Sequence, residues 1–257
     1  MAPMPPSPRP ERPAAALVVV MGEPTPSAAV AHRAAIVAGS GAGRRVVLAD
    51  LSRHALLRGD APSTGPGLAE LLQIARFRRP DGADVRALVR RGEEGHDVLA
   101  GGDHPLDWVA TRAEAAALAL RALRRAAHLV VALVDPDLDG ELETGSVDVE
   151  DRHALARAAV AASSAIAIAT APGPVGQRLA EAWEAGARPL RPEATIRAIA
   201  VDAGTLPRHG LAARTIGELV DAACRTPMPS GAHLAPGRLQ PGDLGLGLGP
   251  GPVAQPA

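Results

Sequence analysis

Several residue types are missing or scarce in this chain of 257 residues. Lysine, asparagine and tyrosine are absent, and all 27 basic residues are arginine. Any mechanism that needs a catalytic or phosphate-binding lysine is therefore excluded. Only three aromatic side chains are present, Phe77, Trp108 and Trp183. An extended surface that stacks the bases of single-stranded nucleic acid is excluded as well, because such surfaces need several aromatic rings.

Cysteine, net charge and long apolar runs are also limited. The single cysteine, Cys224, excludes an internal disulfide and a cysteine-rich zinc site, and we expect a small buried thiol near a helix end. The 27 basic and 28 acidic residues nearly balance, which argues against nucleic-acid binding through bulk positive charge. No apolar run approaches the length of about 18 residues that spans a membrane. A cytoplasmic protein without a membrane helix is the expectation.

The two ends of the chain differ in composition from its middle. Residues 1–13 contain six prolines, which no secretory signal would tolerate, and residues 226–257 contain seven prolines and seven glycines. Both segments are predicted to be disordered tails. Residues 14–225 alternate short apolar runs with helical segments, which is typical of βαβ units. We therefore expect one α/β domain, a three-layer, doubly wound fold with a mainly parallel sheet.

The positions of the strands and helices follow from apolar periodicity. Buried strands are predicted at residues 15–21, 45–51, 97–100, 129–134, 165–169 and 195–201. Helices are predicted at residues 27–38, 67–75, 85–91, 111–127, 149–162, 175–185 and 210–224. Ser27, directly after Pro26, is expected to cap the first of these helices.

Four segments, in their order and spacing, resemble the MinD/ParA family of dimeric P-loop ATPases, which includes the pilus proteins CpaE and TadZ. They are the strand-loop-helix at residues 18–30, GRRVVLADLS at 43–52, GLAELL at 67–72, and residues 128–163. The resemblance covers roughly residues 14–224. It implies the P-loop NTPase fold and a protein that dimerises across its nucleotide-binding face.

The phosphate loop of this family runs Lys-Gly-Gly-x-Gly-Lys-Thr, and its backbone N–H groups surround the phosphates. The matching stretch is residues 21–27, where only Gly22 and the hydroxyl of Ser27 are retained. Pro24 and Pro26 lack N–H groups, and Glu23 places a carboxylate where the triphosphate would lie. Two like charges about 4 Å apart repel by about 4 kcal/mol at an effective dielectric constant near 20. Binding of ATP in the family's manner is therefore not expected.

The other positions that bind nucleotide in the family also depart from its pattern. Asp50 matches the first aspartate of its Asp-x-Asp motif, but Ser52 replaces the second, and Asp202 replaces the asparagine that reads adenine. Asp135 matches the aspartate at a strand end that holds the magnesium shell in the family. The resemblance thus implies a vestigial nucleotide site without a catalytic residue, a metal ion or a bound cofactor, formed by Gly22, Ser27, Asp50 and Asp135.

The preserved framework and the degenerate loop together predict a pseudo-ATPase. Its expected role is that of a non-hydrolytic scaffold or regulatory partner in cell-division, chromosome-partitioning or pilus positioning. The expected partner is a second copy of the chain or an intact MinD/ParA-like ATPase. The alternative is an active ATPase with a rearranged phosphate loop, which would hold ATP and magnesium through Ser27, Asp50 and Asp135.

A third hypothesis is non-specific DNA binding without nucleotide. Arg76, Arg78 and Arg79 surround Phe77 and could contact phosphates. Acidic residues nearby in the sequence would dilute this charge, and solvated helix ends explain the cluster equally simply. The tail lacks the basic amphipathic helix by which MinD proteins reach membranes.

Two further motifs suggest other ligands. Residues 135–140 resemble the start of a calcium-binding EF-hand loop, but Ser146 stands where the bidentate glutamate belongs, and the segment follows a strand. A solvated switch-type loop is favoured, and a weak magnesium site at Asp135 and Asp137 stays open. The glycine-rich residues 39–43 close a helix and do not open one, so helix termination explains them better than NAD binding does.

Overall fold

The computed structural model describes residues 15–41, 43–53, 55–57, 66–92, 94–102, 112–138, 153–202 and 209–225. The predicted tails, residues 1–13 and 226–257, lie outside the described residues. So do the beginning of the helix predicted at 149–162 and most of the loop compared with an EF-hand, from Asp139 onward.

A seven-stranded sheet runs through the centre of the protein. The strand order is β3-β4-β2-β5-β1-β6-β7, and every neighbouring pair is parallel except β3 and β4. The predicted α/β fold with a mainly parallel sheet is therefore confirmed. The strands are β1 (Ala16–Gly22), β2 (Val46–Asp50), β3 (Arg90–Arg91), β4 (Asp97–Leu99), β5 (Leu129–Leu133), β6 (Ala165–Thr170) and β7 (Thr195–Ala200).

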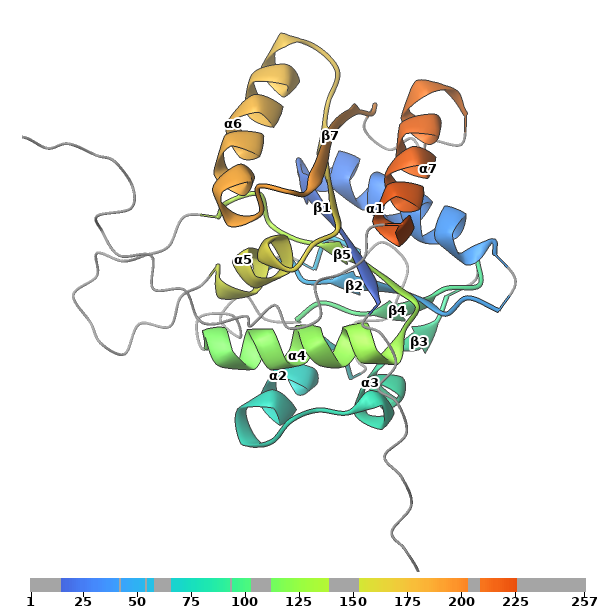
Figure 1. Ribbon diagram of the computed structural model, residues 1–257, viewed down its shortest axis with the longest axis vertical. Coiled ribbons are helices and arrows are strands. Elements are labelled where there is room, and N and C mark those ends of the chain that lie inside the picture. The colour runs from blue at the N-terminus through green and yellow to red at the C-terminus, as the bar shows by residue number, and fades with distance from the viewer. Residues whose placement is uncertain are drawn as a thin grey trace, which may run out of the picture.

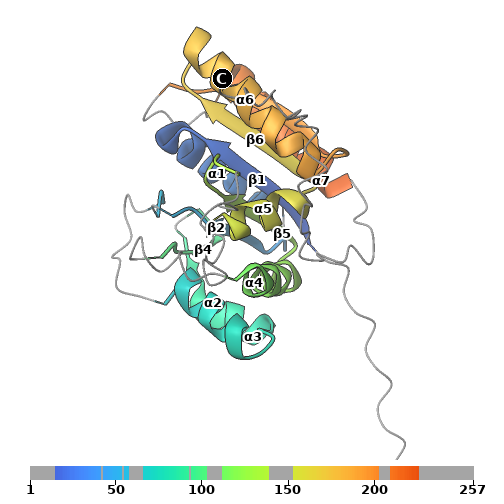
Figure 2. The ribbon, with the colours of Figure 1, turned by 90° about the vertical axis from the view of Figure 1, so that its left-hand side faces the viewer.

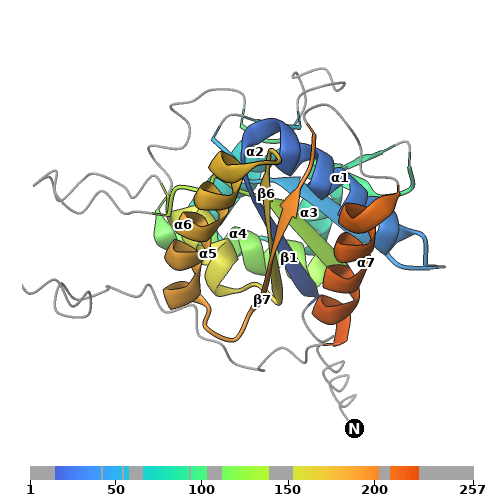
Figure 3. The same cartoon turned by 90° about the horizontal axis from the view of Figure 1, so that it is seen from above.

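Helices cover both faces of the sheet and make three layers, as Figure 3 shows. One face carries α1 (Pro24–Gly39) and α7 (Gly210–Arg225). The other face carries α2 (Leu68–Phe77), α3 (Gly82–Leu88), α4 (Ala113–Ala126), α5 (Ala154–Ala161) and α6 (Pro174–Leu190). Figures 1 and 2 place α2 and α3 beside α4, at the opposite end of the molecule from α6 and α7. None of the helices in the described residues has both the length and the apolar character needed to cross a membrane.

The central strand β1 shows why the strands read as continuous apolar runs. Successive side chains of a strand point to opposite faces. Leu17, Val19 and Met21 pack into the core on the face that carries α5, whereas Val18 and Val20 pack beneath α1 and α7. Because both faces are covered, both sets of side chains must be apolar.

One predicted element has a different structure. The segment predicted as a helix at residues 85–91 divides into α3, which ends at Leu88, and the short edge strand β3. Asp97 on β4 holds this strand, because its carboxylate accepts from Arg91 at 3.3 Å and from Arg45 at 2.7 Å. The contact with Arg45 spans 52 positions, and the pairing of β3 with β4 depends on the sheet, so helical periodicity at residues 85–91 does not reveal either.

The prediction of a buried thiol is wrong. Cys224 is exposed near the end of α7, whereas its neighbour Ala223 is completely buried. Consecutive helical residues point about 100° apart, so only one of the two can face the sheet.

The prediction that residues 39–43 terminate a helix is confirmed, since α1 ends at Gly39 and the N–H of Ser40 donates to the carbonyl of Ile36.

Candidate functional site

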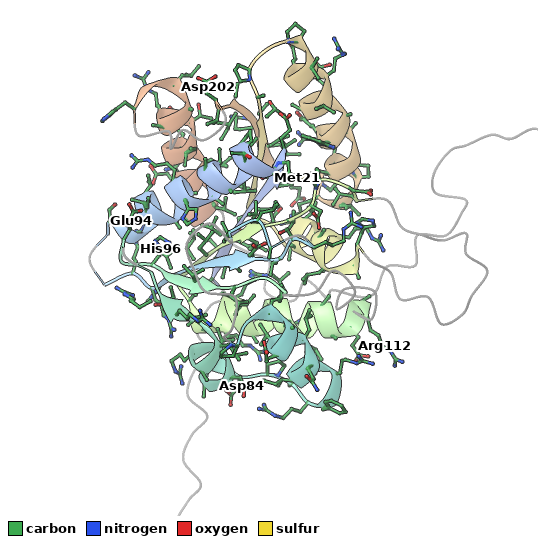
Figure 4. The ribbon with its side chains drawn as sticks, turned by 180° about the vertical axis from the view of Figure 1, so that it is seen from behind. Met21, Asp84, Glu94, His96, Arg112 and Asp202 are labelled. Carbon is green, nitrogen blue, oxygen red and sulfur yellow. The ribbon has the colours of Figure 1, made fainter. Side chains whose placement is uncertain are left out.

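The carboxyl ends of β2, β5, β1, β6 and β7 share one edge of the sheet, where doubly wound folds bind their ligands. Acidic residues lie at several of these strand ends. Asp50 ends β2, Glu23 follows β1, and Asp135 lies two residues beyond β5. Asp202 follows β7 and is exposed; it is labelled in Figure 4.

The connection from β1 to α1 is a single residue long. Gly22 is the last residue of β1 and α1 begins at Pro24, so only Glu23 lies between them. Gly22 has a φ of +138°, and a Cβ atom there would lie 2.0 Å from the carbonyl oxygen of Ala169 on β6. A glycine is required because the two backbones meet here and the chain turns directly into the helix.

Few backbone N–H groups remain available where α1 begins. Pro24 and Pro26 have none. The N–H of Glu23 donates to the carbonyl of Ala169 at 3.0 Å, and that of Ser27 donates to the carbonyl of Glu23 at 2.9 Å. Thr25 therefore carries the remaining N–H group of this turn. Anion sites at helix N-termini depend on several such donors acting together.

Ser27 lies inside the first turn of α1, so its prediction as the N-cap residue is wrong. Glu23 takes the N-cap position instead, because a proline at the first helical position has its φ already set for the helix. Ser27 is completely buried, and its hydroxyl donates to the carbonyl of Pro24 at 3.0 Å.

The side chain of Glu23 joins two strand ends. Its Oε2 accepts a hydrogen bond from the N–H of Ala171, just after β6. This contact fixes a carboxylate between the carboxyl ends of β1 and β6. Nothing in the sequence near Glu23 indicates it, because 148 positions separate the two residues.

Asp50 is almost completely buried and organises the chain that follows β2. Its Oδ1 accepts from the N–H and the hydroxyl of Ser52 at 3.1 and 2.5 Å, and its Oδ2 accepts from the N–H of Leu57 at 2.8 Å. Burial raises the pKa of the Asp50 carboxyl, and the nearby charge of Asp135 raises it further, against the opposing effect of the hydrogen bonds.

Asp135 contacts the same chain segment from the neighbouring strand. Its Oδ2 accepts from the N–H of Arg53 at 2.8 Å, and the Nε of Arg53 lies 3.6 Å from it. The carboxylates of Asp50 and Asp135 thus both hold the segment after β2, and their charges interact. The sequence placed both aspartates at strand ends but did not reveal Arg53 as a partner of Asp135.

The described residues do not contain a group of three or more side chains arranged to bind a metal ion. Asp137, compared above with a calcium or magnesium ligand, lies 3.4 Å from the Nε2 of His153. Asp135 and Asp137 therefore both contact cationic or potentially cationic groups, which compete with a metal ion for their oxygens.

The arginine cluster at the end of α2 lies far from this edge. Figure 4 shows Asp84 of α3 at the opposite end of the molecule from Asp202. Arg78 donates two hydrogen bonds to Asp84, at 2.5 and 2.7 Å, which neutralises its charge. Phe77 is 83% exposed. These contacts favour solvated helix ends over a built phosphate-binding surface.

The ion pair between Arg78 and Asp84 predicts a measurable titration. The hydrogen bonds from Arg78, with one from the backbone of Asp81, lower the pKa of Asp84 to about 2. Because this pKa lies below the ordinary value of 3.8, ionised Asp84 stabilises the fold above about pH 4, and that contribution is lost as the pH falls toward 2. We expect carboxyl NMR to show this low pKa, and Arg78→Gln to raise it toward 3.8. Arg79→Gln is the control and should leave it unchanged; an unchanged value in Arg78→Gln contradicts the assignment.

Comparison with solved structures identifies proteins of similar architecture. A ParA family ATPase from Chlorobium tepidum matches 80% of this chain and 98% of its own, with 12% identity and a TM-score of 0.56. A plasmid partition protein from Borrelia burgdorferi matches 81% of this chain and 97% of its own, also with 12% identity and a TM-score of 0.56. Cobyrinic acid a,c-diamide synthase from Mycobacterium smegmatis, with bound ADP and magnesium, matches 84% of each chain with 20% identity and a TM-score of 0.50.

No protein-family model matches the sequence, and no curated protein matches it either. The likeness therefore lies in the architecture, at identities where side chains have diverged. It extends over most of the sheet and its helices, and it agrees with the MinD/ParA resemblance of the four sequence segments. The chain has the P-loop NTPase fold of the ParA family ATPases.

Proposed function

We propose that this protein is a non-hydrolytic member of the ParA/MinD type, a cytoplasmic scaffold or regulatory partner in cell-division, chromosome-partitioning or pilus positioning. The observation that carries the proposal is the single-residue connection between β1 and α1. In the family this connection is the loop that surrounds the phosphates. Here it consists of Glu23 alone, followed by a helix that begins with a proline.

The residues of this turn do not fit a triphosphate. Glu23 and Ser27 use their N–H groups within the protein, and two prolines supply none. The carboxylate of Glu23, fixed by Ala171, would repel each nearby phosphate charge by about 4 kcal/mol at 4 Å and an effective dielectric constant near 20. The chain has no lysine to offset this repulsion. The M. smegmatis synthase, which has a similar fold, holds ADP and magnesium. We therefore attribute the expected lack of nucleotide binding in this chain to the local residues of the turn and not to its fold.

Two side chains of the vestigial site, Ser27 and Asp135, also have partners within the protein. The hydroxyl of Ser27 is buried and donates to the carbonyl of Pro24. Asp135 is paired with Arg53, whose positive charge disfavours a second cation at the same carboxylate. Both observations weigh against the alternative of an active ATPase that uses Ser27, Asp50 and Asp135.

Calorimetric titration with Mg-ATP tests the proposal. We expect no saturable binding at micromolar concentrations and no ATP hydrolysis above background. Glu23→Gln is a matched variant that removes the charge and keeps the shape. It should not restore binding, because the prolines and the missing lysine remain. Micromolar binding by the wild-type protein would overturn the proposal in favour of the active-ATPase alternative.

Exposed apolar side chains at the same edge support a protein partner. Among the described residues, the large apolar side chains that are exposed are Phe77, Val175 and Leu211. Val175 is the second residue of α6, which follows β6, and Leu211 is the second residue of α7, which follows β7. Both therefore lie toward the carboxyl ends of adjacent strands. Although α6 and α7 cover opposite faces of the sheet, both exposed side chains lie toward the edge across which the resembled family dimerises, and we infer dimerisation, with a second copy or with an intact relative, across this edge.

Light scattering after size-exclusion chromatography tests this association. We expect concentration-dependent dimerisation, either of the protein alone or in a mixture with an intact ParA/MinD-like ATPase of the same cell. Leu211→Glu should weaken it at least tenfold, because a charge in an apolar interface loses its hydration. Phe77→Ser, a change to an exposed apolar residue at the distant end of α2, is the control. A monomer at all concentrations, alone and in the mixture, would count against this role.

DNA binding without nucleotide receives less support. The ion pair with Asp84 neutralises Arg78, which leaves Arg76 and Arg79 of the original cluster. Two phosphate contacts would give an affinity that falls only slightly with salt, with a slope of about −2 in a plot of log affinity against log salt. A steeper slope would favour this hypothesis over the scaffold.

A further inference from the structure

Two arginines without a carboxylate partner lie at the amino edge of the sheet, opposite to the candidate site. Arg124 lies near the end of α4 and Arg191 directly follows α6. The Nε of Arg124 donates to the carbonyl of Ala15 at 2.9 Å, and the Nε of Arg191 donates to the carbonyl of Ser163 at 3.2 Å. Within the described residues, neither guanidinium forms an ion pair.

The two backbone acceptors belong to neighbouring strands. Ala15 precedes β1 and Ser163 precedes β6, and these strands are paired in the sheet. Just beyond them, the N–H of Ser164 donates to the carbonyl of Leu17 at 2.8 Å, and the hydroxyl of Ser164 accepts from the N–H of Leu17 at 3.4 Å. The starts of β1 and β6 are thus held together, and the backbone at each start accepts a hydrogen bond from one of the two arginines.

The end of α4 is held at this corner from two sides. Figure 1 shows the C-terminal end of α4 beside the beginning of β1. The N–H of Ala15 donates to the carbonyl of Arg124 at 3.0 Å, in addition to the side-chain bond in the opposite direction. The backbone at Arg124 is therefore fixed against the start of β1, and this limits where the guanidinium of Arg124 can lie.

Arg124 is an unusual residue in this environment. It is 8% exposed, and its Nη2 is buried without a hydrogen-bond partner. Burial lowers the pKa of Arg124, and the positive charge of nearby Arg191 lowers it further. A buried guanidinium beside a second cation is unfavourable unless an anion compensates it. Arg191 is only partly buried, which leaves an approach for such an anion from solvent.

We propose that this corner binds a small oxyanion from solution, a phosphate or carboxylate group, between the guanidinium groups of Arg124 and Arg191. Planar guanidinium groups donate paired N–H bonds that match the oxygens of phosphate and carboxylate. The anion lies against the partly buried guanidinium of Arg191 and offsets the positive charge of both arginines. This site does not depend on the proposed function, because Glu23 and the β1–α1 turn lie at the other end of the strands.

Calorimetric titration of the full chain with inorganic phosphate, at constant ionic strength with chloride as the reference salt, tests the site. We expect saturable binding and a phosphate-dependent rise in the melting temperature. Arg191→Gln should weaken binding at least tenfold, because it removes charge-assisted hydrogen bonds. Arg178→Gln, which changes an exposed arginine on the preceding helix α6, is the matched control and should bind as the wild type does.

Two further measurements make the result decisive. Arg124→Gln, after circular dichroism has shown that it is folded, should also lose phosphate binding, whereas Glu23→Gln should retain it. Succinate in place of phosphate distinguishes the ligand class: the tighter ligand of the two identifies a phosphoryl or a carboxylate group. The proposal is overturned if the wild type binds neither anion saturably, or if Arg191→Gln binds phosphate as tightly as the wild type does.

Discussion

Gly22→Ala is expected to lower the free energy of unfolding by about 4 kcal/mol or more, enough to unfold much of the protein. The added Cβ atom would lie 2.0 Å from the carbonyl oxygen of Ala169, which belongs to the backbone of β6 and cannot rotate away. Gly22 also has a φ of +138°, a conformation that is strained for any residue with a side chain. Relief would require β1 and β6 to separate at the edge where α1 begins.

Urea denaturation followed by circular dichroism measures this effect. The control is Gly217→Ala, in the interior of α7, where an added Cβ atom has no neighbour within 4 Å. This control should stabilise the protein by about 0.5–1 kcal/mol, because alanine favours a helix over glycine by that amount. Equal midpoints for Gly22→Ala and the wild type would show that the close approach of β1 and β6 is absent in solution.

Asp50→Ala is expected to destabilise the protein by about 3 kcal/mol. The change leaves two N–H groups and one hydroxyl without their acceptor, and an unsatisfied buried donor costs about 1–3 kcal/mol. The chain segment after β2 should also lose its fixed conformation. Amide hydrogen exchange at Ser52 and Leu57 should then accelerate, together with the loss of stability in urea.

The pH dependence of the same variant separates the charge of Asp50 from its hydrogen bonds. Burial raises the pKa of Asp50 above its ordinary value of 3.8, so the folded protein binds this proton more tightly than the unfolded chain does. The stabilisation from Asp50 therefore falls as the pH rises from about 4 through the folded-state pKa. We expect the stability difference between the wild type and Asp50→Ala to be larger at pH 4 than at pH 7. A difference that grows with pH would contradict the raised pKa of Asp50.

The proposed function and the anion site make separable predictions at opposite ends of the same strands. At the turn that contains Glu23, we expect ATP not to bind. At Arg124 and Arg191, we expect a small oxyanion to bind. If either prediction fails, the other is unaffected. Substitution of Glu23 or of Arg191 in turn identifies the end of the sheet that is responsible for any phosphate-dependent effect.

The amino-acid sequence by itself determined the class of the fold and the order of strands and helices, apart from the short edge strand β3. The apolar run at residues 15–21 became β1 at Ala16–Gly22, and the pattern at 165–169 became β6 at Ala165–Thr170. This part is predictable because a strand buried on both faces needs consecutive apolar residues, and an amphipathic helix needs its own spacing. The sequence also placed Asp50 and Asp135 at strand ends, which in a parallel sheet meet at one edge. The vestigial nucleotide site that they suggest stays a prediction.

Only the tertiary structure decided which groups these residues contact. Glu23 accepts from the N–H of Ala171, Arg53 pairs with Asp135, and Arg124 donates to the carbonyl of Ala15 at the far edge. Cys224 faces solvent although its neighbour faces the core. Each contact joins elements that are distant along the chain, and it depends on strand order and helix rotation. A local pattern of residue types carries no information about either, because both arise when the elements pack together.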